Sequence, residues 1–199
     1  MSMDQIWLLN AGWPRAFWFS YAAFGLFEVW VWLRDRRAAS GEDADRGSLR
    51  AVVVVIVAGI FAAFYAANAF DFARLTQWKP EARLAALVLI WLGLALRLWA
   101  ILTLGAFFRV TVHLQDGHRM ITTGPYRIVR NPAYLGSLLT LVGVGLGLGS
   151  WLSVLALLLA GVIAFGWRIR VEDAALTARF GEAHLAYRKR KAALIPFVW

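Results

Sequence analysis

The last third of the sequence holds one pair of charged residues whose spacing could serve catalysis. Arg168 and Glu172 are four residues apart, so on a helix they share one face. They can form a simple ion pair beside a basic membrane flank. Alternatively, Glu172 can meet a cationic cofactor while Arg168 meets an anionic or carbonyl group of a substrate. The spacing alone leaves both interpretations open.

The passage TTGPYRIVRNPAYLG, residues 122–136, is the second place where chemistry could occur. Asn131 is a favoured N-cap and Pro132 suits the first helical position, so the pair predicts a helix that begins here. The N-terminus of a helix offers free N–H groups and a partial positive charge to an anion. Tyr126 and Tyr134 could add aromatic surface. The passage could therefore be a cofactor pocket, a metal site or merely a basic connecting loop.

A metal site is the weakest of these alternatives. The three histidines, His113, His118 and His184, show no ligand spacing such as HExxH. Cysteine is absent, which excludes a disulfide framework, a thiolate zinc site and a thiol nucleophile. No glycine-rich strand–turn–helix is present for a dinucleotide, so any nucleotide-like ligand would have to lie among helix ends.

The composition indicates an integral membrane protein that would position these residues on helices. Hydrophobic residues make up 61% of the 199 residues and charged residues only 17%, against roughly a quarter in soluble domains. We predict an all-α, polytopic fold with about five transmembrane helices and a C-terminal cytoplasmic amphipathic helix. A span needs about 20 apolar residues, and five segments qualify or nearly qualify: about Trp13–Leu33, Ala51–Phe70, Leu84–Leu104, Pro132–Gly149 and Trp151–Trp167.

The distribution of basic residues predicts the orientation of these spans. Sixteen of the 21 lysines and arginines lie in the connection after the first span, in the passage 105–131 and in the tail from Arg168. Such a bias places that side in the cytoplasm and the N-terminus outside. We therefore attribute the net charge of +9 to membrane topology and anionic lipid, not to nucleic acid. In a bacterium this corresponds to the inner membrane.

The fourth predicted span is short and rich in glycine. Its roughly 18 residues give about 27 Å of helix, barely enough to cross, so a re-entrant hairpin stays possible. Gly143 with Gly147, and Gly145 with Gly149, have a small-xxx-small spacing, which predicts close packing against the fifth span. Because only Gly149 and Ser150 join the two segments, they should form a tight antiparallel hairpin.

Polar residues elsewhere complete the predicted arrangement. Downstream of the fifth span, a single amphipathic helix is expected, with one face formed by Leu176, Phe180, Ala183 and Tyr187. Within the spans, charged side chains are costly and usually paired, so we predict that Glu28 and Arg97 form a structural ion pair.

Two blocks of this sequence resemble a known family of membrane enzymes. GHRMITTGPYRIVRNPAYLG, followed after a helical hairpin by RIRVEDAALTARFGEAHLAYRKRKAALIPF, is similar to the isoprenylcysteine carboxyl methyltransferases, their bacterial relatives and the phospholipid N-methyltransferases. The resemblance covers about Thr111 to Phe197. It implies methyl transfer from S-adenosyl-L-methionine to a lipophilic acceptor that enters from the bilayer. It also implies a division into three N-terminal spans, residues 1–104, and a catalytic half, residues 105–199.

The resemblance also assigns candidate site residues. Glu172 would contact the cofactor and Arg168 the substrate, and both would be catalytic. The remaining cofactor contacts would be His118, Arg119, Met120, Ile121, Tyr126, Asn131, Pro132, Ala133 and Tyr134, with a further contact near Thr111. The tail helix would then bring Glu172 and Tyr187 over the site.

Two residues depart from the family pattern. Asn131 stands where histidine is usual, and Asn can donate a hydrogen bond but cannot carry a proton near neutral pH. Asp173 stands where a second glutamate is common. A carboxylate acceptor is favoured, since it needs no base, whereas an amine must first lose a proton. A phospholipid amine N-methyltransferase, an NADPH-dependent reductase of related architecture and a non-enzymatic scaffold are the alternatives.

Overall fold

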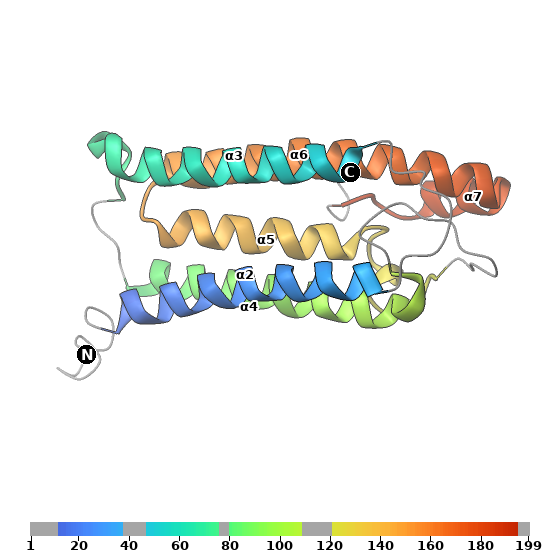
Figure 1. Cartoon of the computed structure of the whole chain (residues 1–199), viewed down its shortest axis with the longest axis horizontal. Helices are drawn as coiled ribbons and strands as arrows, with labels where there is room; N and C mark the ends of the chain where they lie inside the picture. The colour runs from blue at the N-terminus through green and yellow to red at the C-terminus, as the bar shows by residue number, and fades with distance from the viewer. Residues whose placement is uncertain (1–11, 38–46, 76–79, 109–120, 195–199) are drawn as a thin grey trace.

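Six α-helices form the part of the chain that the computed structural model describes, residues 12–37, 47–75, 80–108 and 121–194 (Figure 1). In chain order they are α2 (Trp13–Arg37), α3 (Ser48–Ala69), α4 (Pro80–Leu104), α5 (Pro132–Gly147), α6 (Trp151–Phe180) and α7 (Glu182–Arg190). A short 3-10 turn, η3 (Gly124–Arg127), precedes α5. Only isolated bridges, and no strand, occur among these residues. The predicted all-α class is confirmed.

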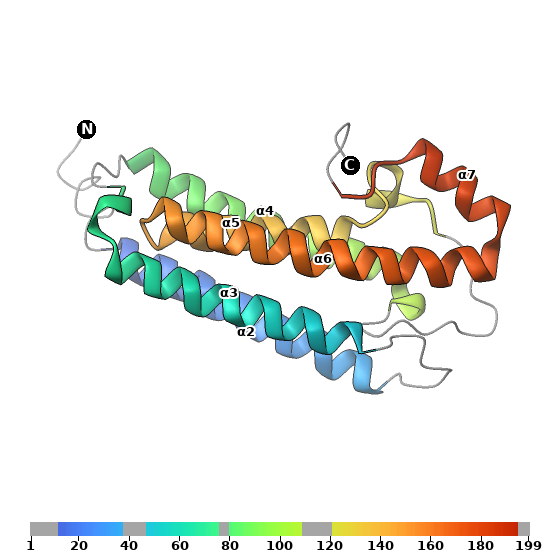
Figure 2. The same cartoon turned by 90° about the horizontal axis from the view of Figure 1, so that it is seen from above.

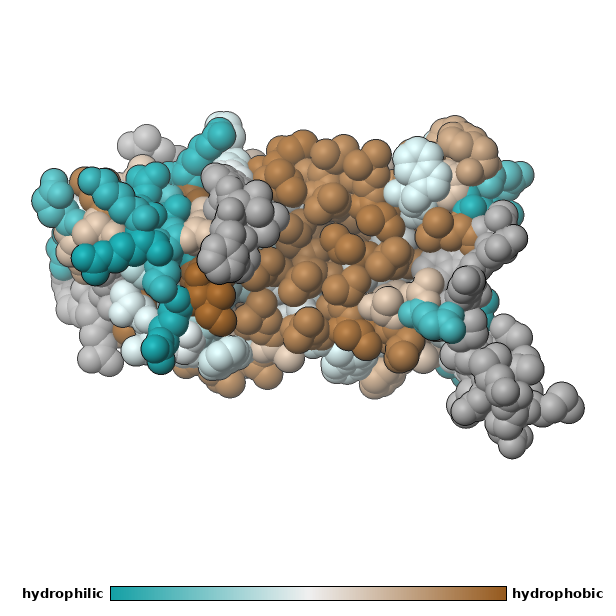
Figure 3. Space-filling model, turned by 180° about the vertical axis from the view of Figure 1, so that it is seen from behind, coloured by the Kyte–Doolittle hydropathy of each residue, from teal (hydrophilic) through white to brown (hydrophobic). Residues whose placement is uncertain are grey.

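The helices have the lengths and the surface of a multi-pass membrane protein. Four of them, within Trp13–Asp35, Ser48–Ala69, Glu81–Leu104 and Trp151–Phe180, are long and apolar enough to cross a bilayer, and the apolar Pro132–Gly147 is shorter. Figure 3 shows a broad hydrophobic band between two ends that carry polar side chains. The five predicted segments therefore correspond to helices.

One predicted boundary is wrong. The fifth span was expected to end near Trp167 and to be followed by one amphipathic helix, but α6 continues without a break to Phe180. The break comes at Gly181, whose φ of 52° lies in a region that other residues rarely adopt. Nothing between Trp151 and Phe180 interrupts helical geometry, because this stretch lacks proline and its glycines keep a helical conformation. The tail is therefore divided between α6 and α7.

The helices are arranged with α5 between two pairs. In Figure 1, α3 lies along α6 and α2 along α4, with α5 between these two layers. Figure 2 shows the bundle from above, with α2 and α3 on one side and α4, α5 and α6 on the other. Helices α4 and α5 approach closely where Gly93 faces Gly136. A Cβ on Gly93 would lie 2.4 Å from the Gly136 carbonyl oxygen, so these two backbones touch.

The glycines of α5 pack against more neighbours than predicted. Gly145 faces Val154 of α6, as expected for close packing with the fifth span. The prediction is wrong for Gly143, which faces Ala86 and Ile90 of α4, and for Gly147, which faces Phe17 of α2. Successive glycines point in different directions because α5 is surrounded by neighbouring helices.

Substituting Gly136 should destabilise the bundle. In Gly136→Ala the new Cβ would lie 2.6 Å from the Gly93 carbonyl oxygen and 2.8 Å from the Arg97 amide nitrogen, both backbone atoms. We expect a loss of about 1–3 kcal/mol in unfolding free energy, because α4 and α5 must separate. The measurement is denaturant unfolding in detergent micelles.

Gly25→Ala on α2 is the matched control for that substitution. Its Cβ would meet nothing within 4 Å, so alanine should be neutral or stabilise the helix by up to about 1 kcal/mol. Equal unfolding free energies for the two variants would contradict the close contact of α4 with α5.

Candidate functional site

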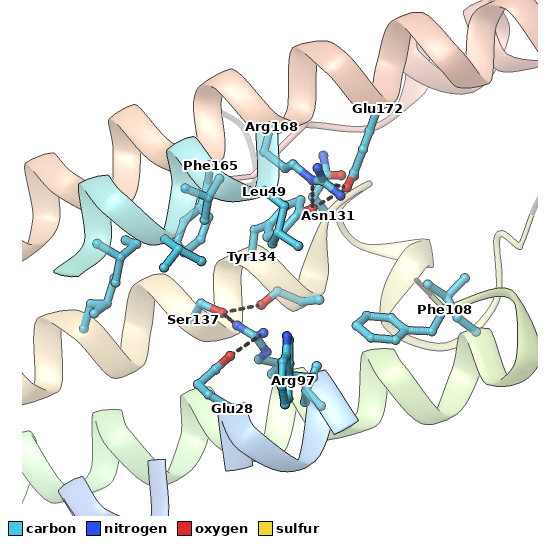
Figure 4. A pocket seen from close by; sticks show the side chains of 18 of the residues that line it. Glu28, Leu49, Arg97, Phe108, Asn131, Tyr134, Ser137, Phe165, Arg168 and Glu172 are labelled. Atoms are coloured by element: carbon cyan, nitrogen blue, oxygen red, sulfur yellow. Dashed lines mark hydrogen bonds and ion pairs between the residues drawn. The ribbon is translucent and has the colours of Figure 1, made fainter. Parts of the chain in front are cut away.

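A cavity of about 1090 Å³ lies between the two helix pairs and reaches from an apolar interior to a polar end. Its apolar walls come mainly from α2 and α3, and include Phe24, Val31, Val52, Ile56 and Ile60. Polar side chains from α2, α4, α5 and α6 point into the part shown in Figure 4. The cavity can therefore receive a molecule that is partly apolar and partly polar.

The polar wall on α6 is built by the predicted pair, Arg168 and Glu172. Arg168 Nε lies 3.1 Å from Glu172 Oε1, which confirms the ion pair expected from the spacing of four residues. The Arg168 side chain is only 2% exposed and also donates a hydrogen bond to the hydroxyl of Ser48 on α3. Because Arg168 is held from two helices, its orientation at the cavity is fixed.

Tyr134, in the first turn of α5, joins this pair from the facing wall. Its hydroxyl donates to Glu172 Oε1, and Arg168 Nε lies 3.3 Å from the same hydroxyl oxygen. The Tyr134 ring stacks on Phe165, with centroids 5.2 Å apart and planes at 15°. Tyr134 and Glu172 thus meet at the wall of the cavity, as the predicted site requires (Figure 4).

Asn131 begins α5 as predicted, but its side chain does not cap the helix. It makes no capping hydrogen bond. Instead its Nδ2 donates to the Ala193 carbonyl over 2.8 Å, and its backbone N–H donates to the same carbonyl over 3.1 Å. The segment after α7 is thereby fastened to the start of α5. In this position Asn131 serves as a hydrogen-bond donor, a role that needs no ionisable group.

A buried charge cluster behind Asn131 was not foreseen from the sequence. Arg130 Nη1 contacts both oxygens of Asp173, at 2.6 and 2.8 Å. His184 and Arg188 of α7 approach the same carboxylate at 3.5 and 3.4 Å. These residues are far apart in sequence, so no spacing predicts their contact. The cluster ties the loop before α5 to α6 and α7.

The pKa of His184 makes the docking of α7 sensitive to pH. Burial lowers this pKa below its usual 6.5, against the opposing effect of Asp173, and Arg130 and Arg188 lower it further. The unfolded chain therefore takes up the proton more readily than the folded one. Stability should be fully present above about pH 6.5 and should fall as the pH drops toward the folded pKa.

This pH dependence can be isolated with His184→Gln. The glutamine amide can still donate a hydrogen bond to Thr177, whose Oγ1 lies 2.9 Å from His184 Nδ1 and itself donates to the Asp173 carbonyl. Melting temperatures measured above and below pH 6.5 should differ less in this variant than in the unmodified protein. An equal difference in both proteins would show that other groups cause the loss.

Two further tyrosines close the polar end of the cavity. The Tyr187 hydroxyl donates to the Tyr126 carbonyl over 2.7 Å, so α7 is held against η3. Burial raises the pKa of Tyr187 to about 12, and burial together with Glu172 raises the pKa of Tyr126 well above 10. Both hydroxyls stay protonated at neutral pH. Tyr187 therefore lies beside the site, as expected for the tail.

Most of the predicted site residues that the structure describes line this one cavity. They are Ile121, Tyr126, Asn131, Ala133, Tyr134, Arg168 and Glu172. Pro132 is fully buried and does not line it. His118, Arg119 and Met120, and the contact expected near Thr111, lie outside the described residues. The catalytic and binding roles of all of them stay predictions.

The predicted pair of Glu28 and Arg97 is also present and also lines the cavity. Arg97 Nη2 lies 2.9 Å from Glu28 Oε2, and Arg97 also donates to the Ser137 hydroxyl. The ion pair is confirmed. Its place in the wall of the cavity, and the part taken by Ser137, were not predicted, because neither can be read from spacing.

Comparison with known proteins gives one match to a family model. Residues 82–183, about half of the chain, match the family described as phospholipid methyltransferase. This stretch contains most of α4 and all of α5 and α6. It therefore includes both walls that carry Arg168, Glu172 and Tyr134.

Individual methyltransferases are similar to this chain over part of their length. A probable protein-S-isoprenylcysteine O-methyltransferase of Oryza sativa subsp. indica is 33% identical over 56% of this chain and 60% of its own. The protein-S-isoprenylcysteine O-methyltransferase of Schizosaccharomyces pombe is 33% identical over 57% of this chain and 49% of its own. The matched region is thus at most about three fifths of these proteins.

A solved structure shares the fold. It is the eukaryotic intramembrane Ras methyltransferase, an isoprenylcysteine carboxyl methyltransferase, with a TM-score of 0.57 and 27% identity. The match covers 73% of this chain and 52% of that protein.

Proposed function

Because the chain belongs to the phospholipid methyltransferase family, we propose that it is an integral membrane methyltransferase that uses S-adenosyl-L-methionine. Its acceptor is lipophilic, and the carboxylate of an isoprenylcysteine or a similar isoprenoid is favoured. The names of the relatives in rice and fission yeast support this acceptor class.

One observation carries the proposal: Glu172, Arg168 and Tyr134 meet at the polar end of a cavity whose walls on α2 and α3 are mainly apolar. A charged nucleoside needs polar surroundings, and a lipid needs apolar ones. The cavity, at about 1090 Å³, is slightly larger than the usual range of roughly 300–1,000 Å³ for ligand pockets. Its size suits two molecules that must touch.

The residues present fit this cofactor. The Glu172 carboxylate can attract its amino group or its sulfonium, and the attraction is stronger here than in water because the site is partly desolvated. Tyr126 and Tyr134 also line the cavity and offer aromatic surface. When bound, the cofactor would supply an electrophilic methyl group.

The chain itself then has to position the acceptor. Arg168, fixed by Ser48 and Glu172, can hold a carboxylate with its guanidinium. A carboxylate is already deprotonated, so no general base is required. Bringing the two reactants together and excluding water accounts for catalysis of this kind.

The same geometry indicates an orientation in the membrane. We place the end of the molecule that carries Arg130, Glu172 and α7 in the cytoplasm, where a polar cofactor is available. The excess of lysine and arginine at this end supports that placement, and it leaves the N-terminus outside. For a bacterial protein the membrane would be the inner one.

A second candidate is N-methylation of a phospholipid amine, which the description of the matching family favours. An ammonium group must lose a proton before it can attack a methyl group. The carboxylates nearest the site, Glu172 and Asp173, are both engaged by cationic side chains. We therefore favour the carboxylate acceptor.

A transfer assay distinguishes the two candidates. Purified protein is incubated with S-adenosyl-L-methionine labelled in its methyl group and with either N-acetyl-S-farnesylcysteine or phosphatidylethanolamine. We expect a base-labile methyl ester on the first and no label on the second. Label on phosphatidylethanolamine alone would favour the second candidate, and no transfer to either or to extracted membrane lipids would contradict the proposal.

A further inference from the structure

The cavity carries a second polar wall that the proposed methyl transfer does not use. Arg97 of α4 pairs with Glu28 of α2 and donates to Ser137 of α5. Figure 4 shows this group across the cavity from Arg168 and Glu172. The proposed chemistry assigns no role to Glu28, Arg97 or Ser137.

A purely structural tether does not account for charges at this position. Both residues lie within predicted membrane spans, where ionisable groups are costly and commonly mark a ligand site. The Glu28 side chain is 36% exposed and that of Arg97 15%, so the pair is incompletely covered. Apolar residues of similar volume would tie α2 to α4 as well or better.

The pair also has unused hydrogen-bonding capacity. Among the described residues, Arg97 Nε and Glu28 Oε1 are buried and have no hydrogen-bond partner. One is a donor and the other an acceptor, and a buried polar atom of either kind destabilises the protein when it is left without a partner. Because Glu28 is partly exposed, its carboxylate has room to turn toward a ligand in the cavity.

We infer that the cluster of Glu28, Arg97 and Ser137 binds a neutral group of the acceptor that both donates and accepts a hydrogen bond, a hydroxyl or an amide. A carboxylate has no donor and would be repelled by Glu28. An ammonium has no acceptor and would be repelled by Arg97. Only a neutral group complements both partners.

Helix α5 carries one residue of the Glu28, Arg97 and Ser137 cluster and one residue beside the Arg168–Glu172 pair, where the acceptor would react. Tyr134 contacts the Arg168–Glu172 pair, and Ser137, one turn later on the same helix, contacts the Arg97–Glu28 pair. An acceptor with its carboxylate at Arg168 would therefore carry the neutral group close to that carboxylate. This inference rests on the proposed function for the identity of the ligand as the methyl acceptor.

The test uses four S-farnesyl-3-thiopropionic acids that differ only at carbon 2, which carries hydrogen, hydroxyl, acetamido or ammonium. Dissociation constants are measured with and without S-adenosylhomocysteine, so that no methyl transfer occurs. We expect the hydroxyl or the acetamido compound to bind about tenfold more tightly than the hydrogen compound. The ammonium compound should show no gain.

The double variant Glu28→Leu/Arg97→Met removes the pair without leaving one charge unpaired, so it should fold. It should bind the hydrogen compound within about twofold of the unmodified protein and lose the preference for the neutral polar groups. Asp71→Leu/Arg74→Met is the matched control, because that pair, at 3.0 Å, is exposed and outside the cavity. It should keep the preference.

Three results would overturn the inference: no preference in the unmodified protein, a preference that survives in the double variant, or an equal loss of affinity for all four compounds. Failure of the proposed function is a separate outcome. It would appear as absent binding of S-adenosylhomocysteine, and the preference measured without that ligand would still decide the role of Glu28 and Arg97.

Discussion

Glu172→Gln is expected to lower kcat/KM for methyl transfer by about 10- to 150-fold, equivalent to about 1.5–3 kcal/mol for a hydrogen bond to a charged group. Glutamine can still accept the hydrogen bond from Tyr134, so the wall of the cavity should keep its shape. The lost charge removes the attraction for a cationic cofactor. The measurement is initial rates at varied S-adenosyl-L-methionine concentration.

Glu182→Gln serves as the matched control for this loss. Glu182 is exposed at the start of α7 and does not line the cavity. Its variant should keep the rate of the unmodified protein within about twofold. If Glu172→Gln also kept that rate, with both variants folded to the same melting temperature, Glu172 would have no role in binding the cofactor.

Arg130→Met should cause the largest loss of stability, about 3–5 kcal/mol of unfolding free energy. Arg130 contacts both oxygens of Asp173, and its side chain is only 10% exposed. Without Arg130, the buried Asp173 carboxylate loses its two shortest charged hydrogen bonds and keeps only the longer contacts to His184 and Arg188. Arg130 Nε also donates to the Lys191 carbonyl over 3.1 Å, so the segment after α7 should loosen as well. Denaturant unfolding in detergent measures the change.

Arg127→Met provides the comparison, since Arg127 is an exposed arginine three residues earlier. It should change stability by no more than about 0.5 kcal/mol. Adding Asp173→Asn to Arg130→Met should recover part of the loss, because the unpaired carboxylate is removed. Equal losses for the two arginine variants would show that the cluster does not hold α7 in place.

Local patterns predicted the helices and one ion pair of the site. The apolar segments gave the membrane helices, and the spacing of four residues placed Arg168 and Glu172 in contact on α6. Asn131 and Pro132 marked the start of α5. Each of these features depends on residues that are neighbours on one helix, which is why the sequence alone was sufficient.

Contacts between distant segments could not be predicted in the same way. Asn131 bonds the Ala193 carbonyl and not its own helix, and Arg130 meets Asp173 across 43 positions. The first contact depends on the return of the chain after α7, which Gly181 makes possible by ending α6. The second depends on how α6 lies beside the loop before α5. The periodicity of apolar residues describes one helix at a time, so it does not predict contacts between distant segments. The packing of Gly143 and Gly147 differed from expectation for the same reason.

Calorimetric titration of S-adenosylhomocysteine into the purified protein tests the central claim most directly, because the cavity is proposed to hold this nucleoside against the wall formed by Glu172 and Tyr134. We predict saturable binding with one molecule per chain, and no heat of binding with NADPH under the same conditions. Binding of NADPH alone, or of neither ligand, would contradict the account.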